Sequence, residues 1–375
     1  MKTYTIPVIP GDGIGPEVIA EGMKVLDAAA QVHGFRIEWV TYPHGADHYL
    51  RTGELLSDRT LQELSQFKAI YFGACGDERV PPGVLERGIV LTIRNHFDEY
   101  VNLRPIRLLE GVRGPLCDKK PADIDFVVVR ENTEDFYVAA GGKASIGTTR
   151  SQLNISRKTY QARFDLEITS NEPIAYQVGL ISRAGARRVM RYALEFARGR
   201  KKHLTLIDKA NVLTEMYGLW RSESAEVATE FRDVQTDILL VDAAAMEFVR
   251  NPERFDVVLA PNLFGDILTD LGAMLQGGLG LAPGGNINPR GTSMFEPVHG
   301  SAPVLKGLQK ANPVATIWAG AMLLDSLGEN SAGKAVIHAI EKCLRSGRVL
   351  TPDLGGTSST SGVGDEIARM LGVSA

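Results

Sequence analysis

The chain has 375 residues, of which 44% are hydrophobic and 23% charged, so it is long enough for two folded domains and its composition excludes intrinsic disorder. Its formal net charge of −4 excludes a basic nucleic-acid-binding surface, and no apolar run approaches the roughly 18 residues of a membrane span. The N-terminus does not resemble a signal peptide, and Cys75, Cys117 and Cys343 lack metal or redox spacing. We therefore expect a cytoplasmic protein with no nucleic-acid or membrane partner.

Regular elements alternate along the chain, beginning with a strand at 4–9, the glycine-rich loop 10–17 and a helix from about 16 to 33. Further strands are predicted at 35–42, 68–73, 98–107, 124–130, 164–168, 203–208, 236–241 and 255–260, and helices at 183–198, 214–230, 262–275, 312–327 and 331–345. The stretches 277–291 and 353–364 are predicted to be ordered loops. This alternation indicates an α/β protein.

The first loop does not match the dinucleotide-binding fingerprint G-x-G-x-x-G. Gly11, Gly13 and Gly15 alternate, and Pro16 stands where the helix of that motif would begin. The fold is therefore predicted not to be a Rossmann fold. The glycines fit either a tight turn or a close approach of a ligand to the backbone.

Two carboxylates, Asp266 and Asp270, follow an apolar strand at helical spacing, which puts both on one face of a helix. Acidic residues in a first helical turn can simply complement the helix dipole. However, two further predicted strands end close to charged residues, at Lys209 and at Asp242, and the strand ends of α/β sheets bind ligands. A set of oxygen ligands favours magnesium or manganese.

Three arginines lie at or beside strand-like apolar runs, namely Arg94, Arg104 and Arg130. An arginine fork binds a carboxylate through two parallel hydrogen bonds. Each arginine alone is better explained as a surface residue or a member of a structural ion pair. Together beside a metal they would suit a small substrate with two carboxylates.

Six ordered segments give the chain a resemblance to the isocitrate/isopropylmalate dehydrogenase family. They are Gly11–Glu17, Asn102–Pro105, Val129–Glu134, Asp208–Asn211, Asn262–Asp270 and Met294–Pro303. Within the family, 97–106 and 130–134 most resemble the tartrate dehydrogenase/D-malate dehydrogenase branch. The resemblance implies an α/β, two-domain isopropylmalate-dehydrogenase-like fold with a mixed sheet.

The implied activity is a metal-dependent, NAD-linked oxidation and decarboxylation of a 2-hydroxy acid that carries a β-carboxylate. By the family pattern, Asp266 and Asp270 hold Mg²⁺ or Mn²⁺ in one subunit, and Asp242 reaches in from the other subunit of a homodimer with shared active sites. Lys209, also from the partner, is the expected base for the substrate hydroxyl, and Tyr137 the expected acid that protonates the enolate carbon. Arg94, Arg104 and Arg130 would bind the substrate carboxylates.

For the cofactor, the resemblance places a set of residues near NAD, namely Gly73, Ala74, Glu296, His299, Gly300, Ser301, Ala302, Val304 and Asn312. One of these positions departs from the family pattern, because NAD-dependent members usually carry an aspartate where this chain has Val304 and NADP-dependent members often a lysine. The segment 351–356 resembles NAD-dependent members, which favours NAD.

The expected domains are 1–98 with 252–375 for the dinucleotide, and 99–251 for dimerisation and for substrate and metal binding. D-malate or tartrate is the first expected substrate. Leu91 and the segment 208–213 also fit a 3-isopropylmalate or homoisocitrate-type dehydrogenase. D-malate and tartrate enzymes tend to have a tryptophan in the region of 86–88, where this chain has Glu-Arg-Gly. A catalytically silent regulatory homologue is a further alternative, supported by Val304 alone.

Overall fold

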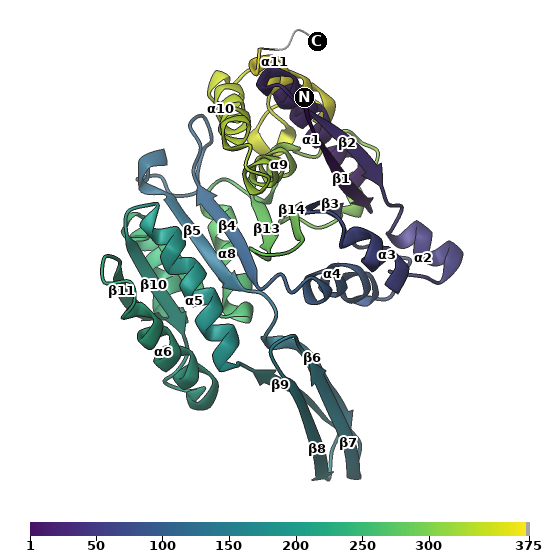
Figure 1. The fold of residues 1–375 in the computed structure, drawn as a ribbon, viewed down its shortest axis with the longest axis vertical. Helices are drawn as coiled ribbons and strands as arrows, with labels where there is room; N and C mark the ends of the chain where they lie inside the picture. Colours follow the sequence, from purple (N-terminus) through teal and green to yellow (C-terminus); the bar gives the residue numbers. More distant parts are fainter. Residues whose placement is uncertain (373–375) are drawn as a thin grey trace. The chain divides into compact units, whose positions relative to one another are not determined.

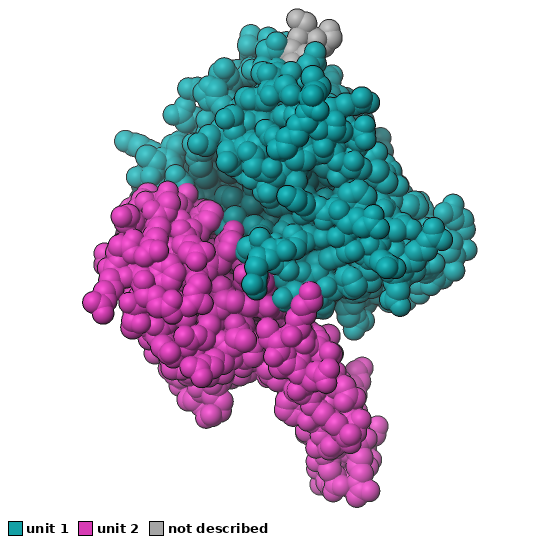
Figure 2. Space-filling model, viewed as in Figure 1, with its two compact units in different colours: residues 1–99, 103–125, 270–375 teal, residues 100–102, 126–269 magenta. Residues whose placement is uncertain are grey.

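The computed structural model describes residues 1–372 of the chain and divides it into two compact units (Figure 2). Unit 1 comprises Met1–Glu99, Leu103–Asp125 and Asp270–Ala375, and unit 2 comprises Tyr100–Asn102 and Phe126–Thr269. Relative to the domains expected from the sequence, 103–125 belongs to unit 1 and 252–269 to unit 2. The roles expected for the two domains stay predictions.

Unit 1 holds a mixed sheet in which β13, β14, β3, β1 and β2 are neighbours in that order (Figure 1). β14 pairs with β13 in antiparallel register, whereas the pairs β14·β3, β3·β1 and β1·β2 are parallel. The strands are β1 (Lys2–Gly11), β2 (Phe35–Thr41), β3 (Ala69–Ala74), β13 (Pro283–Ile287) and β14 (Ser293–Pro297). The mixed sheet of the predicted fold is therefore confirmed.

Two helices of unit 1, at 15–33 and 314–326, pack directly against this sheet, and the last two helices of the unit pack on them. The helices of unit 1 are α1 (Gly15–His33), α2 (Ala46–Thr52), α3 (Asp58–Leu64), α4 (Thr92–His96), α9 (Val314–Ser326), α10 (Asn330–Ser346) and α11 (Thr360–Met370). α9 is buried on every side from Val314 to Leu324, as expected for a helix that is apolar all round. At the start of α1, Pro16 stands in the first turn, where its missing N–H costs no helical hydrogen bond.

Unit 2 is built on the parallel strand order β11-β10-β12-β5, whose members are β5 (Asp125–Glu131), β10 (His203–Asp208), β11 (Gln235–Leu240) and β12 (Val257–Ala260). Its helices are α5 (Arg183–Arg198), α6 (Thr214–Ala228), α7 (Val241–Arg250) and the first part of α8 (Asn262–Leu275). β12 is an uninterrupted buried run, as expected for a strand inside a parallel sheet. The chain passes between the units within β4 (Val101–Arg107) and within α8.

Two antiparallel pairs complete unit 2: β6 (Asp135–Ala144) with β9 (Ile174–Leu180), and β7 (Gly147–Ser156) with β8 (Gln161–Ser170) (Figure 1). Only part of β8 was predicted from the sequence. β7 and β8 alternate between exposed and half-buried residues, so they carry a weak hydrophobic signal.

Three sequence-based predictions are corrected. The apolar run before Arg94 is helical, with a π-helical segment at Glu86–Leu91 followed by α4, because a short apolar run fits either a strand or a buried helix. The predicted loop 277–291 contains β13, and the predicted loop 353–364 contains the first turn of α11. Among residues 1–372, no helix combines the length and the apolar character that crossing a membrane requires.

Candidate active site

The glycine-rich loop of unit 1 is held against the strand and loop that were predicted to bind the dinucleotide. Asp12 N donates to Ala74 O at 2.8 Å, and Ile14 N donates to Ser301 O at 2.9 Å. Gly13 has a φ of +58°, and a Cβ there would lie 1.9 Å from Ser301 O. Only glycine fits this position, so the glycines here serve close backbone packing.

Two of the remaining predicted cofactor residues of unit 1, His299 and Asn312, differ in whether their side chains are already hydrogen-bonded within the protein. His299 Nδ1 lies 3.0 Å from Gly300 O, whereas His299 Nε2 is buried with no hydrogen-bond partner among the described residues. Burial lowers the pKa of His299. The amide of Asn312 is already used by the protein, since it donates to Asp353 at 3.0 Å and accepts from Val314 N. The unpartnered His299 nitrogen fits a site that receives a polar ligand.

Val304 lies one residue beyond Pro303, with 85% of its surface exposed. Gly300 is also exposed, and a Cβ there would meet no atom within 4 Å. Gly73, by contrast, is buried in β3, where a Cβ would lie 2.3 Å from Pro10 O, so its role is packing. The loop 299–304 thus has unfilled space at Gly300, next to the residue whose Nε2 lacks a hydrogen-bond partner, His299.

Arg94 of α4 is buried in unit 1 and forms an ion pair with a predicted cofactor residue. Arg94 Nη2 lies 2.9 Å from Glu296 Oε1, and both side chains are about nine-tenths buried. Asn286 Nδ2 donates to the same Glu296 oxygen at 2.7 Å. Glu99 is fully buried on the chain just after α4, and burial raises its pKa, while Arg94 lowers it and Glu296 raises it further. The structure thus brings Arg94 and Glu296 together.

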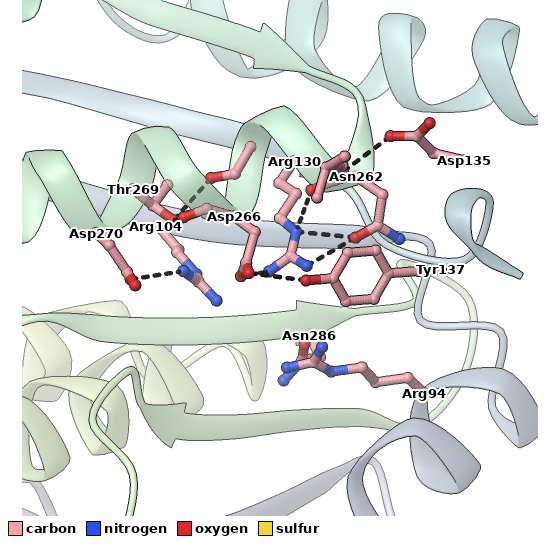
Figure 3. Close-up of polar contacts among 12 residues, drawn as sticks. Arg94, Arg104, Arg130, Asp135, Tyr137, Asn262, Asp266, Thr269, Asp270 and Asn286 are labelled. Atoms are coloured by element: carbon pink, nitrogen blue, oxygen red, sulfur yellow. Dashed lines mark hydrogen bonds and ion pairs between the residues drawn. The ribbon is translucent and has the colours of Figure 1, made fainter. Parts of the chain in front are cut away.

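Arg104 and Asp270 form the second predicted pair in unit 1. Arg104 Nη1 lies 3.8 Å from Asp270 Oδ1, with the arginine side chain 9% exposed and the aspartate 64% exposed (Figure 3). The Asp270 side chain is therefore largely exposed on α8, one helical turn after Asp266.

Arg130 of unit 2 lies near the end of β5 and is 1% exposed. Its Nε donates to the carbonyl and to the side-chain oxygen of Asn262 at 2.9 and 3.0 Å, and its Nη2 donates to the same side-chain oxygen at 2.7 Å (Figure 3). Its Nη1 lies 2.6 Å from Asp266 Oδ1. The guanidinium therefore orients the first turn of α8.

Tyr137 reaches the same aspartate from β6. Tyr137 Oη donates to Asp266 Oδ2 at 2.8 Å, and the Arg130 guanidinium lies 5.0 Å from the centre of the tyrosine ring (Figure 3). The expected acid, the expected clamp and the expected metal ligand are thus in direct contact. Each of the two aspartates of α8 thus forms an ion pair with an arginine.

Lys209 and Asp242 form a separate pair in unit 2. Lys209 Nζ lies 2.7 Å from Asp242 Oδ1, and this hydrogen bond lowers the pKa of Asp242. Lys209 follows β10, and Asp242 stands in the first turn of α7 directly after β11. The prediction that two strands end close to these charged residues is confirmed, and the structure shows that the two strands pair with each other.

The donor set fits a hard divalent cation. Asp266 and Asp270 supply oxygens one turn apart on α8, which are ligands that magnesium and manganese accept. Within residues 1–372, no group of three or more His, Cys, Asp and Glu side chains is placed to hold a metal ion. The expected third ligand, Asp242 of a second subunit, stays a prediction.

Two side chains at this site were not predicted to act there. Asn262 orients Arg130, and its position as the first residue of α8 was the available signal. Asp12 is 7% exposed, and its carboxylate accepts from Ala46 N at 2.7 Å and from Gly76 N at 3.0 Å. An aspartate between glycines is typical of such backbone-binding turns.

Comparison with known proteins agrees with this arrangement. Residues 5–367 match the Isocitrate/isopropylmalate dehydrogenase family. The chain is 47% identical to the 3-isopropylmalate dehydrogenase of Thermobifida fusca over 99% of this chain and 98% of that protein, and 42% identical to the D-malate dehydrogenase [decarboxylating] of Escherichia coli over 99% of both. The crystal structure of isocitrate dehydrogenase from Methylococcus capsulatus superposes with a TM-score of 0.83 at 34% identity, covering 98% of this chain and 99% of that one. The chain therefore belongs to the isocitrate/isopropylmalate dehydrogenase family of decarboxylating hydroxy-acid dehydrogenases.

Proposed function

We propose that the chain oxidises and decarboxylates a 2-hydroxy acid bearing a β-carboxylate and an apolar β-substituent, of the 3-isopropylmalate type, with NAD and Mg²⁺ or Mn²⁺. The main support for this substrate class is the set of side chains on the helical segment before Arg94. Leu91 lies one turn before Arg94 and is half-buried, whereas Glu86 and Arg87 are exposed. Arg87 Nε donates to Gly83 O at 2.9 Å, so it is held locally.

This proposal reverses the order of the substrates expected from the sequence. A polar β-substituent, as in tartrate, would need a polar partner beside Arg94, and the side chain one turn away is a leucine. The relative named for 3-isopropylmalate also shares more identical residues with this chain than the one named for D-malate. D-malate stays the second candidate, because its named enzyme matches the chain over its full length.

The chain's own residues supply the binding and the proton transfers. Arg94, Arg104 and Arg130 bind the substrate carboxylates. Lys209 Nζ accepts the proton of the substrate hydroxyl, and Tyr137 Oη donates a proton to the carbon from which carbon dioxide has left. Asp266 and Asp270 would hold the divalent cation, which would supply Lewis acidity at the substrate oxygens, and the loop 299–304 would lie near NAD, which would supply the hydride acceptor.

We further propose a homodimer in which Lys209 and Asp242 serve the site of the partner. Beside Asp242, α7 exposes Met246 and Val249, and α8 exposes Ile267, with 65%, 44% and 59% of their surfaces accessible. Exposed apolar side chains on helices that carry site residues suit an interface with a second copy of the chain.

The substrate proposal is tested by measuring NAD reduction with manganese on 3-isopropylmalate, homoisocitrate, isocitrate, D-malate and tartrate. We expect the highest kcat/KM with 3-isopropylmalate, and a Leu91→Ala variant should lose efficiency on it while keeping its efficiency on D-malate. A wild-type preference for D-malate or tartrate that Leu91→Ala leaves unchanged would contradict the proposed substrate class.

The shared site is tested by complementation. Lys209→Ala and Tyr137→Phe chains, each expected to be slowed by roughly 10²-fold or more when assayed alone, are mixed under conditions that allow subunit exchange. Half of the dimers should then be mixed and one of their two sites complete, which restores about a quarter of the wild-type rate. No recovery despite exchange, shown by mass spectrometry of the mixed dimers, would mean that both residues act within one subunit.

A further inference from the structure

Tyr137 lies between two residues with an unfavourable backbone conformation, Asp135 and Ala139. Asp135 pairs with Leu180 and Ala140 with Val178, so four residues of β6 lie opposite the single residue Gly179 of β9. Asp135 and Ala139 have φ angles of +63° and +60°, a conformation that residues with a Cβ rarely adopt. Such bulges and strained residues persist only where surrounding contacts hold them.

The carboxylate of Asp135 supplies those contacts at the first end. Asp135 is 1% exposed, its Oδ1 accepts from Tyr217 Oη of α6 at 3.0 Å, and its Oδ2 accepts from Leu263 N of α8 at 2.9 Å. Leu263 is in the first turn of α8, where backbone N–H groups have no partner within the helix. The ring of Tyr217 also packs against Phe264, with centroids 5.2 Å apart.

These contacts join the two elements whose side chains meet at the site. Tyr137 lies two residues after Asp135 on β6, and Asp266 lies three residues after Leu263 on α8. Tyr137 Oη and Asp266 Oδ2 are 2.8 Å apart. A carboxylate that fixes the start of β6 to the start of α8 therefore sets the separation of these two groups.

We propose that Asp135 is a positioning residue, which holds the strained bulge of β6 on the N-terminus of α8 so that the Tyr137 hydroxyl is aligned for its proton transfer. The inference rests on the proposed role of Tyr137 and adds a residue that does not touch substrate. Strain alone would favour glycine at position 135, and the aspartate supplies two hydrogen bonds that glycine lacks.

The test compares three substitutions at this position. Asp135→Ala keeps the left-handed strain and loses both acceptors. Asp135→Gly relieves the strain and also loses them. Asp135→Asn tolerates the left-handed conformation, and its amide can accept from Leu263 N while donating to Tyr217 Oη. We expect kcat to fall about tenfold or more in the alanine and glycine variants and to be largely recovered with asparagine.

Two readouts separate positioning from loss of stability. The solvent deuterium isotope effect on kcat should rise above the wild-type value in Asp135→Ala, as in Tyr137→Phe, because proton transfer becomes slower. Asp256→Ala is the matched control, since Asp256 is a buried aspartate at the opposite end of β12 that binds Arg200. It should lower the melting temperature and leave the isotope effect unchanged.

The outcomes also separate this inference from the proposed function. If Tyr137→Phe keeps the wild-type rate and isotope effect, the proposed role of Tyr137 is wrong. If Tyr137→Phe is impaired while Asp135→Ala and Asp135→Gly keep the wild-type kinetics, only the positioning role is wrong. A wild-type isotope effect in a slow, destabilised Asp135→Ala enzyme would likewise overturn it, because loss of folded enzyme lowers the rate without changing the step that limits it.

Discussion

Replacing Arg130 with lysine tests whether the planar guanidinium is required at the start of α8. Lysine keeps the positive charge but offers one nitrogen in place of a fork. In the wild type, three nitrogens of Arg130 contact two acceptors of Asn262 and one carboxylate oxygen of Asp266. A single ammonium group cannot reach all of these acceptors at 2.6–3.0 Å.

The size of the effect follows from these contacts. Arg130 and Asn262 are both 1% exposed, so water does not readily replace a lost donor. If the new ammonium keeps the ion pair with Asp266, both acceptors of Asn262 lose their donor, and a hydrogen bond to a charged group contributes about 1.5–3 kcal/mol. We expect Arg130→Lys to lower the free energy of unfolding by about 3 kcal/mol. It should also lower kcat/KM by roughly 10²-fold through displacement of the Asp266 and Tyr137 side chains.

The assay is urea unfolding followed by tryptophan fluorescence, together with steady-state kinetics on the best substrate. Arg187→Lys is the control, because Arg187 pairs with Glu223 and Glu226 at a partly exposed position. Such pairs contribute about 1 kcal/mol or less. Arg130→Lys with the stability of this control and near-wild-type kinetics would refute the argued role of the fork.

Three further predictions concern the metal, the cofactor and pH. Chelation should abolish turnover and manganese or magnesium should restore it, while full activity of Asp266→Asn in chelator would contradict a metal role for that carboxylate. Val304→Asp should bind NAD about tenfold more tightly and NADP more weakly in calorimetric titrations, since the exposed valine offers no acceptor for the ribose hydroxyls; unchanged binding of both would place the ribose elsewhere. Burial, and then the neighbouring Glu131, raise the pKa of Glu134 to about 7, so its stabilising contribution is full below its ordinary pKa of 4.5 and is lost as the pH rises through about 7. Urea unfolding at pH 5 and pH 8 should show a loss on the order of 2–3 kcal/mol in the wild type that Glu134→Gln abolishes, and an equal loss in both proteins would assign it to other groups.

The sequence predicts the elements whose burial pattern is strong. The strands predicted at 203–208 and 255–260 and the helices predicted at 183–198 and 262–275 correspond to β10, β12, α5 and α8 of the structure. The seven-residue helices α2 and α3 contain too few turns for a periodic signal, and the π-helical segment Glu86–Leu91 has neither strand nor α-helical spacing.

At the site, spacing predicted that Asp266 and Asp270 share a helix face, but it could not predict which groups neutralise them. Arg130 is 136 residues before Asp266, and only the fold brings the two within hydrogen-bonding distance. The left-handed conformation of Asp135 was also not predictable, since its neighbours Glu134 and Phe136 are not turn-forming residues. Tertiary contacts hold this backbone, and local propensity does not reveal them.

The predicted site residues share one electrostatic feature that the sequence did not reveal. Each predicted cation is paired with a predicted acidic residue of the same unit, and the pairs are Arg94 with Glu296, Arg104 with Asp270, Arg130 with Asp266, and Lys209 with Asp242. Under the proposed function, a substrate dianion bound by the arginines would compete with these carboxylates, and a divalent cation bound by the aspartates would compete with the arginines and the lysine.

Binding of the cation and binding of the substrate should therefore favour each other, because each ligand engages the groups that compete with the other ligand. A dication that draws Asp266 and Asp270 away leaves Arg130 and Arg104 with unbalanced positive charge, which favours the carboxylates of the substrate. A bound dicarboxylate in turn leaves the aspartates with unbalanced negative charge, which favours the cation. Because such coupling is reciprocal, manganese should tighten substrate binding by the same factor by which substrate tightens manganese binding. Equilibrium titrations without NAD measure both factors, and a ratio of one in each would mean that these ion pairs persist in the loaded enzyme.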